Sequence, residues 1–539
     1  MDAFIGVDVG TGSARAGVFD GTGKLLGTAR RDIRIWRGEH DIVEQSSEDI
    51  WAAVVASVRE AMALSGIEPS AVRGLGFDAT CSLVVVGPGG KGLPVGPSED
   101  PARDIIVWMD HRALEQAARI NATGHKVLRY VGGVISPEME TPKLLWLKEN
   151  RPAIFADAEH FFDLADYLTF RATGSLTRSV CTLTCKWTYL AHERRWDPDY
   201  FHTIGLGELA EEGFVRIGTD VADIGEPISG GLTQAAAAEL GLQPGTAVGA
   251  PAIDAHAGGI GTLGASRDGV AAEPASELAF IMGTSSCAMA VTREAAFVDG
   301  VWGPYRDSLL PGYWLLEGGQ SAYGAGLDFL VSLHPAHAAV RQAAEARGLS
   351  LLSELERRAI EAAGSVEEAA RLARSLHVVP EFLGNRSPEA DPAATAAITG
   401  LTLDASENAL VRLFVAGLCG LSYGTGDIVR AMAEKGVALD AIVVSGGAAR
   451  SPLLRRILSD ATGMRVVLPK TAEPVLLGSA IIGAVAARAF PDLSAAAAHM
   501  CGIGDETVPN PDLAEFHARK RAAYDILRRA EREVRALGR

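Results

Sequence analysis

The stretch that decides the fold is AFIGVDVGTGSARAGVF, residues 3–19. Its apolar residues alternate and then continue around a Gly-Thr-Gly-Ser turn at positions 10–13, a pattern that predicts two strands of a hairpin. A third strand is expected within residues 24–35. Residues 46–66 then show helical spacing, with a capping box at their start and a glycine at their end, and residues 72–86 return to strand. This order of elements predicts an α/β fold.

A second unit of the same kind begins past the midpoint of the chain. The run LAFIMGTSS, residues 278–286, repeats the strand and Gly-Thr turn of residues 7–13. Internal duplication would explain the repeat, although such turns are also common in any chain with 60 glycines. A linker rich in Gly, Ala and Ser, residues 258–277, separates the two units. We therefore expect a first domain at 1–264, a second at 276–490 with a helical insertion at 331–380, and a helical tail at 491–539.

Length and charge exclude several classes of protein. A chain of 539 residues exceeds the roughly 250–300 residues at which a single core stops growing, so two domains are the first expectation. The formal charge is −17, from 67 acidic and 50 basic residues, which disfavours nucleic acid or an anionic membrane as a partner. No apolar run approaches the ~18 residues of a membrane span, and an acid stands where a signal peptide would carry base. A cytoplasmic location is expected.

The six cysteines are too scattered for a disulfide framework, in agreement with a reducing compartment. Cys181 and Cys185 have a spacing that could serve a metal, but no second pair follows at ligand spacing. Buried thiols are the favoured interpretation.

The turn at residues 10–13 can bind phosphate. Its glycines let backbone N–H groups come close to an anion, Thr11 and Ser13 add hydroxyl donors, and Arg15 adds a cation. Asp8 at the strand end suits Mg²⁺, because this ion prefers one or two carboxylates and keeps much of its water. Taken alone, the same pattern is equally typical of a plain hairpin turn.

Two further glycine turns follow strand-like segments, at residues 317–321 and 445–451. Open α/β sheets bind ligands outside their strand ends, so three such turns indicate a ligand site more strongly than one does.

Asp254 stands among small and apolar residues just before the linker. An acid in a poorly solvated cleft between two domains is a candidate general base. The alternative for this residue is a helix N-cap, which Asp performs well.

Together these stretches resemble the FGGY carbohydrate kinases, a branch of the actin-like ATPase superfamily, over nearly the entire chain. The resemblance implies an α/β fold of two ribonuclease-H-like domains, with ATP and sugar meeting in a catalytic cleft between them. The stretches that carry it are residues 6–15, 143–150, 252–261, 283–285, 318–321, 384–388 and 445–451.

The resemblance also implies roles for individual residues. Asp254 matches the family's catalytic base, which takes the proton from a sugar hydroxyl, and Asp8 and Asp254 are the acids on the magnesium side. A hinge near residues 258–264 would let the cleft close and exclude water during transfer. Contacts to ATP are implied for Gly10, Thr11, Gly12, Ser13, Arg15, Gly283, Thr284, Ser285, Gly319, Gln320, Gly446, Gly447, Ala448 and Ser451.

Substrate choice is implied by residues 80–84, TCSLV, which look like the run in the D-ribulose kinase branch of the family. Trp108 could instead be partly core, and His111 and Arg112 could instead form a surface ion pair with Asp110. Glu140 replaces the small residue that the family often has there, so it either touches the sugar or leaves the local loop different. Sugar contacts are expected from Asp78, Thr80, Ser82, Trp108, Asp110, His111, Glu140 and Asp254.

We therefore expect a kinase that converts D-ribulose to D-ribulose 5-phosphate with Mg-ATP as donor. Ribitol or another polyol or ketopentose is the alternative substrate, and a non-catalytic actin-like nucleotide switch is the alternative from a different class. The expected partners are ATP and a small sugar or polyol, with no nucleic acid and no membrane, and a homodimer is allowed.

Overall fold

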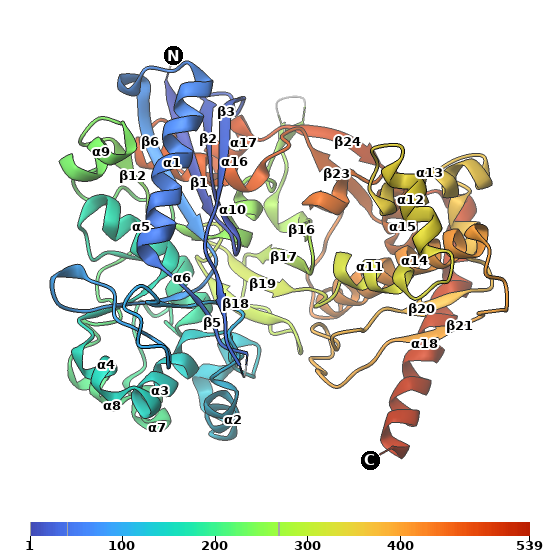
Figure 1. The fold of residues 1–539 in the computed structure, drawn as a ribbon, viewed down its shortest axis with the longest axis horizontal. Coiled ribbons are helices and arrows are strands. Elements are labelled where there is room, and N and C mark those ends of the chain that lie inside the picture. The colour runs from blue at the N-terminus through green and yellow to red at the C-terminus, as the bar shows by residue number, and fades with distance from the viewer. Residues whose placement is uncertain (1, 40, 268–269, 539) are drawn as a thin grey trace.

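Two α/β domains stand side by side in the computed structural model, which describes residues 2–39, 41–267 and 270–538 (Figure 1). The first domain holds a sheet in the order β12-β6-β1-β2-β3, with β13 beside β6, and a second sheet in the order β4-β5-β8-β7-β9. Its strands are β1 (Ala3–Val9), β2 (Ser13–Asp20), β3 (Leu25–Asp32), β4 (Trp36–Arg37), β5 (Val43–Gln45), β6 (Val72–Ala79), β7 (Leu83–Val86), β8 (Ile105–Ile106), β9 (His160–Asp163), β10 (Arg178–Ser179), β11 (Val221–Ala222), β12 (Ala247–Val248) and β13 (Ala252–Ile253). Its helices are α1 (Ser47–Ser65), α2 (Leu114–Ala122), α3 (Glu140–Asn150), α4 (Pro152–Asp157), α5 (Leu164–Thr173), α6 (Val180–Lys186), α7 (Pro198–Ile204), α8 (Gly207–Glu211), α9 (Gln234–Leu240) and α10 (Asp254–Ile260).

The second domain is built on a sheet in the order β18-β19-β17-β16-β22-β23-β24. Its strands are β14 (Ser266–Arg267), β15 (Val270–Ala271), β16 (Glu277–Met282), β17 (Ser286–Thr292), β18 (Trp302–Arg306), β19 (Trp314–Gly318), β20 (His377–Val379), β21 (Ala397–Thr399), β22 (Ala441–Ser445), β23 (Arg465–Pro469) and β24 (Ile503–Thr507). Its helices are α11 (Gly324–Ser332), α12 (His337–Glu345), α13 (Leu351–Ala363), α14 (Glu407–Glu434), α15 (Pro452–Thr462), α16 (Pro474–Ala486), α17 (Leu493–Met500) and α18 (Ala514–Leu537).

The two main sheets are built alike. Each contains an antiparallel hairpin, β1–β2 or β16–β17, and a later strand that pairs in parallel with the first strand of that hairpin. This later strand is β6 in the first domain and β22 in the second. The repeat predicted from the two Gly-Thr turns is therefore confirmed at the level of topology.

The first predicted helix forms where its capping residues place it. The Ser46 hydroxyl accepts a hydrogen bond from the Asp49 amide at 3.3 Å, and Gly66 ends the helix with a φ of 67°. The strand expected over residues 72–86 is in fact two strands, because β6 and β7 belong to different sheets. Thr80, Cys81 and Ser82 connect the two strands at the carboxyl end of β6.

Helix α16 follows the second sheet in sequence but packs against β1 and β6 of the first domain and against α10. The approach is close enough to require glycine: a Cβ at Gly478 would lie 1.8 Å from the Ala257 carbonyl oxygen in α10. Helix α10 continues through Gly258 and Gly259. The linker expected at 258–277, and the hinge expected at 258–264, therefore cannot begin before this helix ends.

The helical insertion is confirmed, since α12 and α13 lie outside the main sheet. The tail differs from the prediction because it is not entirely helical. Strand β24 pairs antiparallel with β23 at the edge of the second sheet before α18 packs beside β20 and β21 (Figure 1).

Helix α14 is long and apolar enough to cross a membrane, contrary to the expectation that no segment would be. In the structure 83% of its apolar window is buried inside the protein. Its apolar side chains, such as Leu413, Phe414 and Leu421, form the core of the second domain.

Candidate active site

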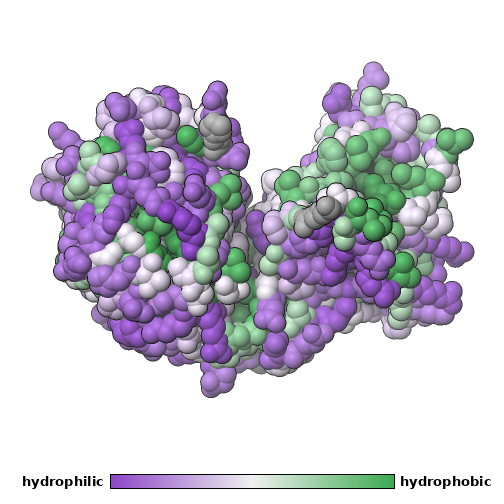
Figure 2. Space-filling view, turned by 90° about the horizontal axis from the view of Figure 1, so that it is seen from below, coloured by the Kyte–Doolittle hydropathy of each residue, from purple (hydrophilic) through white to green (hydrophobic). Residues whose placement is uncertain are grey.

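Two glycine turns, one from each domain, line a cavity of about 510 Å³. The space-filling view shows a hollow between the two lobes (Figure 2). Residues 10–13 connect β1 to β2, and the Gly10 amide donates to the Ser13 carbonyl at 3.1 Å. Residues 283–285 connect β16 to β17, and the Gly283 amide donates to the Ser285 carbonyl at 2.9 Å. The same tight turn thus faces the cavity from both sides, as a pair of anion-binding turns would.

Asp8 stands at the end of β1 and lines the cavity beside the first turn. The Arg15 side chain on β2 donates from Nε to an Asp8 carboxylate oxygen at 2.7 Å and pairs with Glu473 at 2.8 Å. Asp8 and Asp254 are close enough that the charge of Asp8 raises the pKa of Asp254. Two neighbouring carboxylates with room for water fit the coordination that Mg²⁺ prefers.

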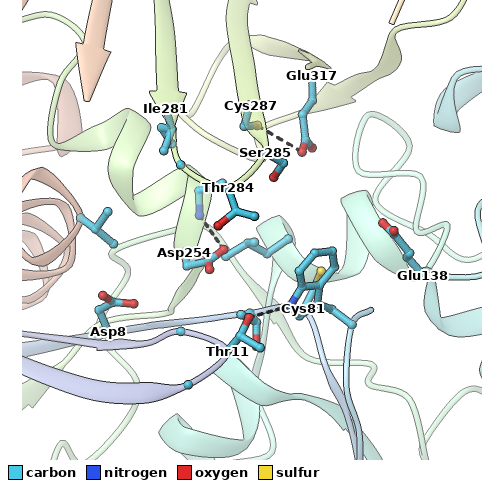
Figure 3. A pocket seen from close by; sticks show the side chains of 18 of the residues that line it. Asp8, Thr11, Cys81, Glu138, Asp254, Ile281, Thr284, Ser285, Cys287 and Glu317 are labelled. Carbon is cyan, nitrogen blue, oxygen red and sulfur yellow. Dashed lines mark hydrogen bonds between the residues drawn. The ribbon is translucent and has the colours of Figure 1, made fainter. Parts of the chain in front are cut away.

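Asp254 is the first residue of α10 and is partly exposed to the cavity. One carboxylate oxygen accepts a hydrogen bond from the Ala255 amide at 2.7 Å. Burial, with the Asp8 charge as a second cause, raises the pKa of Asp254 to about 6. Figure 3 shows its side chain between the strand that carries Asp8 and the turn that carries Thr284. The position and the basicity are those of a general base.

Aromatic and polar side chains line the cavity beside the first glycine turn. The Trp108 indole donates from Nε1 to the Thr11 hydroxyl at 2.9 Å, so its ring is fixed against the first turn. Thr80 and Trp302 line the same space. An amphipathic ring beside hydroxyl groups is a typical surface for a sugar.

Lys186 and Glu317 add a pair of opposite charges to this end of the cavity. The Lys186 side chain is nearly buried, with its Nζ 5.1 Å from the centre of the Trp302 ring. Burial opposes ionisation of Glu317, but the Lys186 ammonium and the His256 ring outweigh it and lower the pKa of Glu317 to about 2. The Glu317 oxygen Oε2 is buried and forms an ion pair with His256, 3.6 Å from the ring Nε2. The ring therefore holds the Glu317 carboxylate at this end of the cavity.

A second cavity of about 500 Å³ lies in the second domain, and Gly283 and Thr284 line both cavities. Gly447, Ala448 and Ser451 form part of its wall. Glu356 of α13 accepts hydrogen bonds from the Ser451 hydroxyl at 2.7 Å and the Leu453 amide at 2.8 Å, so the helical insertion joins the wall to the start of α15. The second cavity thus begins at the second glycine turn, where it adjoins the first cavity, and its walls are both polar and apolar.

Two family models match the chain. The FGGY family of carbohydrate kinases, N-terminal domain, matches residues 3–261, and the C-terminal domain of the same family matches residues 278–487. The chain belongs to the FGGY carbohydrate kinases. The family and the fold implied by the sequence resemblance are thereby confirmed, and the protein is an ATP-dependent sugar kinase.

This kinase is similar to known proteins over its whole length. It is 43% identical to an FGGY carbohydrate kinase domain-containing protein of Danio rerio, covering 99% of this chain and 98% of that protein. It is 40% identical to a D-ribulokinase of Saccharomyces cerevisiae, covering 90% and 72%. The crystal structure of a xylulose kinase from Rhodospirillum rubrum has the same fold, with a TM-score of 0.78 at 21% identity over 99% of both chains.

Most of the residues predicted for phosphate and base line the two cavities of the kinase. Gly446 is not itself in the wall, but its φ of 88° shapes the turn before Gly447. The residues in place are Asp8, Gly10, Thr11, Gly12, Ser13, Arg15, Asp254, Gly283, Thr284, Ser285, Gly447, Ala448 and Ser451, together with Thr80 and Trp108 from the sugar prediction.

Gly319 and Gln320, for which ATP contacts were predicted, line neither of these two cavities. The Gln320 amide donates to the Leu421 carbonyl at 3.0 Å and to the Thr425 hydroxyl at 3.1 Å, so it holds α14. A Cβ at Gly319 would lie 2.1 Å from the Ser286 carbonyl oxygen, which explains the glycine by packing.

Two sugar contacts predicted in and after β6 are also misplaced. Asp78 is fully buried, because its side chain points from β6 to α16 and accepts a hydrogen bond from the Ser479 hydroxyl. Ser82 is buried and accepts from the Trp108 amide at 3.1 Å. It therefore positions Trp108 rather than lining the cavity.

Asp110 and Glu140 are buried in ion pairs instead of facing a sugar. Asp110 accepts from the Val43 amide at 2.6 Å and binds Arg112, so the expected ion pair exists but is buried rather than on the surface. Glu140 lies 3.3 Å from the Lys143 ammonium, and both side chains are fully buried. Glu140 therefore neither reaches the cavity nor opens a loop, since it begins α3.

His111 pairs with Glu138 rather than with Asp110, at 3.6 Å from Nε2 to Oε1. His111 was predicted to contact the sugar, but in the structure it contacts Glu138, and Glu138 lines the cavity.

Sequence reasoning missed several side chains of this wall. Arg386 lies in a stretch that supported the family resemblance, and Glu317 begins the glycine turn at 317–321, so the signal was present without a role attached. Lys186 carried no signal, because only the folded chain brings α6 to β18 and β19. The missed residues with charged, thiol or aromatic side chains include Arg30, Glu138, Lys186, Cys287, Trp302, Glu317 and Arg386.

Proposed function

We propose that this kinase phosphorylates a pentulose, with D-ribulose as substrate and D-ribulose 5-phosphate as product. The observation that carries the proposal is the place of Asp254, between the two glycine turns and the polar end of the same cavity. The similarity to a D-ribulokinase of Saccharomyces cerevisiae supports the choice of sugar. Membership of a carbohydrate kinase family argues against the non-catalytic nucleotide switch.

In the proposed reaction the Asp254 carboxylate takes the proton of a sugar hydroxyl while that oxygen bonds to the γ-phosphorus of ATP. The bond from the γ-phosphorus to the bridging oxygen breaks, and ADP leaves with the electron pair. Asp8 would hold the magnesium ion of Mg-ATP, which offsets negative charge on the phosphates. The two glycine turns would donate backbone N–H groups to the transferred group from opposite domains.

The polar end of the cavity suits an uncharged polyhydroxylated substrate. Its charged side chains are two cations, Lys186 and Arg386, and two anions, Glu138 and Glu317. Because these charges balance, the cavity offers hydrogen-bond donors and acceptors without a net attraction for an ionic sugar. Trp108 and Trp302 add apolar faces for the carbon side of the sugar.

The substrate is tested by steady-state kcat/KM values for D-ribulose, ribitol, L-ribulose, D-xylulose and glycerol with Mg-ATP. We expect the highest kcat/KM for D-ribulose. A higher value for ribitol would move the assignment to a polyol kinase, and one for another ketopentose would identify that sugar.

The base is tested by Asp254→Asn. Loss of the proton acceptor should lower kcat by about 10³- to 10⁴-fold while ATP binding is retained. The matched control is Asp492→Asn, because Asp492 caps α17 through the Ala495 amide, and Asn caps a helix equally well. Turnover of Asp254→Asn at the control's rate would refute the role of Asp254.

A further inference from the structure

Arg386 reaches the sugar end of the cavity from a long loop between β20 and β21. We name residues 384–391 the Arg386 loop. The Arg386 guanidinium lies over the Trp302 ring, 5.6 Å from its centre, and the Lys186 ammonium lies over the same ring. The loop is not part of a larger sheet, and two backbone hydrogen bonds between Asn385 and Asp391, each 2.9 Å, close it on itself. Side-chain contacts join it to the neighbouring elements.

Hydrogen bonds inside and beside the loop fix Arg386 between two anchor points. The Ser387 hydroxyl donates to the Gly300 carbonyl at 2.9 Å, which ties the loop to the segment before β18. The Asn385 side chain donates to Glu381 at 2.6 Å and accepts from the Glu389 amide at 3.0 Å. Movement of Glu389 would therefore be passed to Arg386 over three residues.

Helix α18 holds the other side of this loop with arginine side chains. Arg528 binds Glu389 of the loop, and Arg532 binds the same carboxylate at 2.5 Å. Arg535 binds Asp391 at 2.5 Å. In Figure 1 this helix lies beside β20 and β21, the two strands between which the loop runs.

Arg528 is the centre of these contacts. It is nearly buried, and it also reaches Asp427 of α14 at 2.7 Å and Glu381 at 3.5 Å. One guanidinium thus joins three carboxylates from the core helix α14, the segment before the loop and the loop itself. Removing it would leave partly buried anions facing one another, which strongly disfavours the observed arrangement.

We propose that α18 is a brace that positions the Arg386 loop at the sugar end of the active site, with Arg528 as its positioning residue. The proposal rests on the function proposed above, because D-ribulose is the substrate used to test it. Arg528 lines neither cavity, so it would act through Glu389 and the loop. The C-terminal helix is then part of sugar selection although it lies outside both family-model matches, which end at residue 487.

The test compares Arg528→Met with Arg521→Met. Both arginines lie on α18 and bind Asp427, but Arg521 binds no residue of the Arg386 loop. For Arg528→Met we expect the KM for D-ribulose to rise about tenfold, with the KM for ATP changed less than twofold. Arg521→Met should lower thermal stability to a similar degree without this split, and Arg528→Lys should recover part of the lost affinity.

Hydrogen exchange of residues 381–391 gives a reading that does not depend on turnover. Exchange should be faster in Arg528→Met than in the wild type and unchanged in Arg521→Met. If Arg528→Met does not fold, the less buried Arg535→Gln should show the same two effects at smaller size, because Arg535 contacts the loop through Asp391 and its other ion pair, to Glu531, lies within α18.

Equal changes in the two KM values, or loop exchange that Arg528→Met leaves unchanged, would overturn the brace. A wild-type enzyme that phosphorylates another sugar but not D-ribulose would instead refute the proposed substrate. The KM comparison would then be made with that sugar.

Discussion

At the scale of single residues, the site is governed by the interaction between two carboxylates. Asp254 gains basicity because burial and the neighbouring Asp8 both disfavour its charge. A base with a pKa of about 6 is ionised at neutral pH and is still basic enough to share a proton in the transition state. The same features that prepare Asp254 for catalysis make its ionised form costly in the free protein.

The pH dependence of kcat/KM should report the ionisation of Asp254. The base must be deprotonated, so we expect kcat/KM to be level above pH 6 and to fall about tenfold for each pH unit below it. The measurement is kcat/KM for the sugar from pH 4.5 to 8. An acid limb near pH 4, the value of an ordinary Asp, would contradict the raised pKa.

The contribution of Asp254 to the free energy of unfolding should change with pH in the opposite direction to kcat/KM. Between pH 4 and 6 the unfolded Asp254 loses its proton before the folded one does, so its contribution disfavours the folded state increasingly as the pH rises. Asp254→Asn removes this penalty and should raise the free energy of unfolding at pH 7 by about 1 to 3 kcal/mol. Denaturant unfolding at pH 7 and pH 4 checks this, because the gain should vanish at the lower pH.

At the scale of elements, the position of Asp254 depends on how α10 meets α16. Glycine stands at the contact on both sides, Gly261 directly after α10 and Gly478 within α16, and a Cβ at either position would lie within 2.0 Å of a backbone oxygen of the other helix. Backbone cannot move aside as a flexible side chain can. The register of α10, and with it the location of its first residue, is set by this contact.

Gly478→Ala should therefore harm both stability and catalysis. We expect the free energy of unfolding to fall by about 3 kcal/mol from overpacking. A displacement of Asp254 by about 1 Å would lower kcat by about 10²-fold. The matched control is Gly426→Ala in α14, where the nearest side-chain atoms are 3.8 Å from a new Cβ, so stability should rise by up to about 1 kcal/mol. The measurements are thermal unfolding and kcat of both variants. Losses in Gly478→Ala alone would support the packing explanation, and similar losses in Gly426→Ala would mean that the protein tolerates alanine poorly at any helical glycine.

At the scale of the whole molecule, neither domain holds a complete site. Asp8, Asp254 and the first glycine turn belong to the first domain, and the second glycine turn with the second cavity belongs to the second. In the reaction proposed above both turns bind one phosphoryl group, so that reaction depends on the relative position of the domains. This arrangement links substrate binding to catalysis.

The dependence on both domains predicts slow loss of ATP to water when no sugar is bound. ATP hydrolysis without sugar should be about 10²-fold or more slower than transfer to D-ribulose, because the sugar must fill the cavity before the turns align. Small-angle scattering should show a smaller radius of gyration with D-ribulose and a non-hydrolysable ATP analogue than with either alone. Hydrolysis as fast as transfer would mean that alignment does not require the sugar.

Local pattern predicted the parts of this protein that are decided by neighbouring residues. The hairpin at residues 3–19, the caps at Ser46 and Gly66 and the repeated turn at 283–285 were accessible because they depend on strand period, capping chemistry and glycine turns. For Asp254 the local pattern left a helix N-cap as the alternative, and the family resemblance pointed to the cavity that it lines. The errors share one cause. Asp78, Asp110 and Glu140 are polar residues in promising stretches, but pattern does not tell which face of an element meets another element.

The sequence by itself thus determined the α/β class and the two repeated turns, because spacing and backbone chemistry are properties of short segments, and its resemblance to a family pointed to the acid that faces the cavity. Only the tertiary structure decided which charges share the polar end of the cavity and that α18 holds the Arg386 loop. Those contacts join residues more than a hundred positions apart. Such distant pairs form because packing buries them together, and no local preference of either segment specifies that partner.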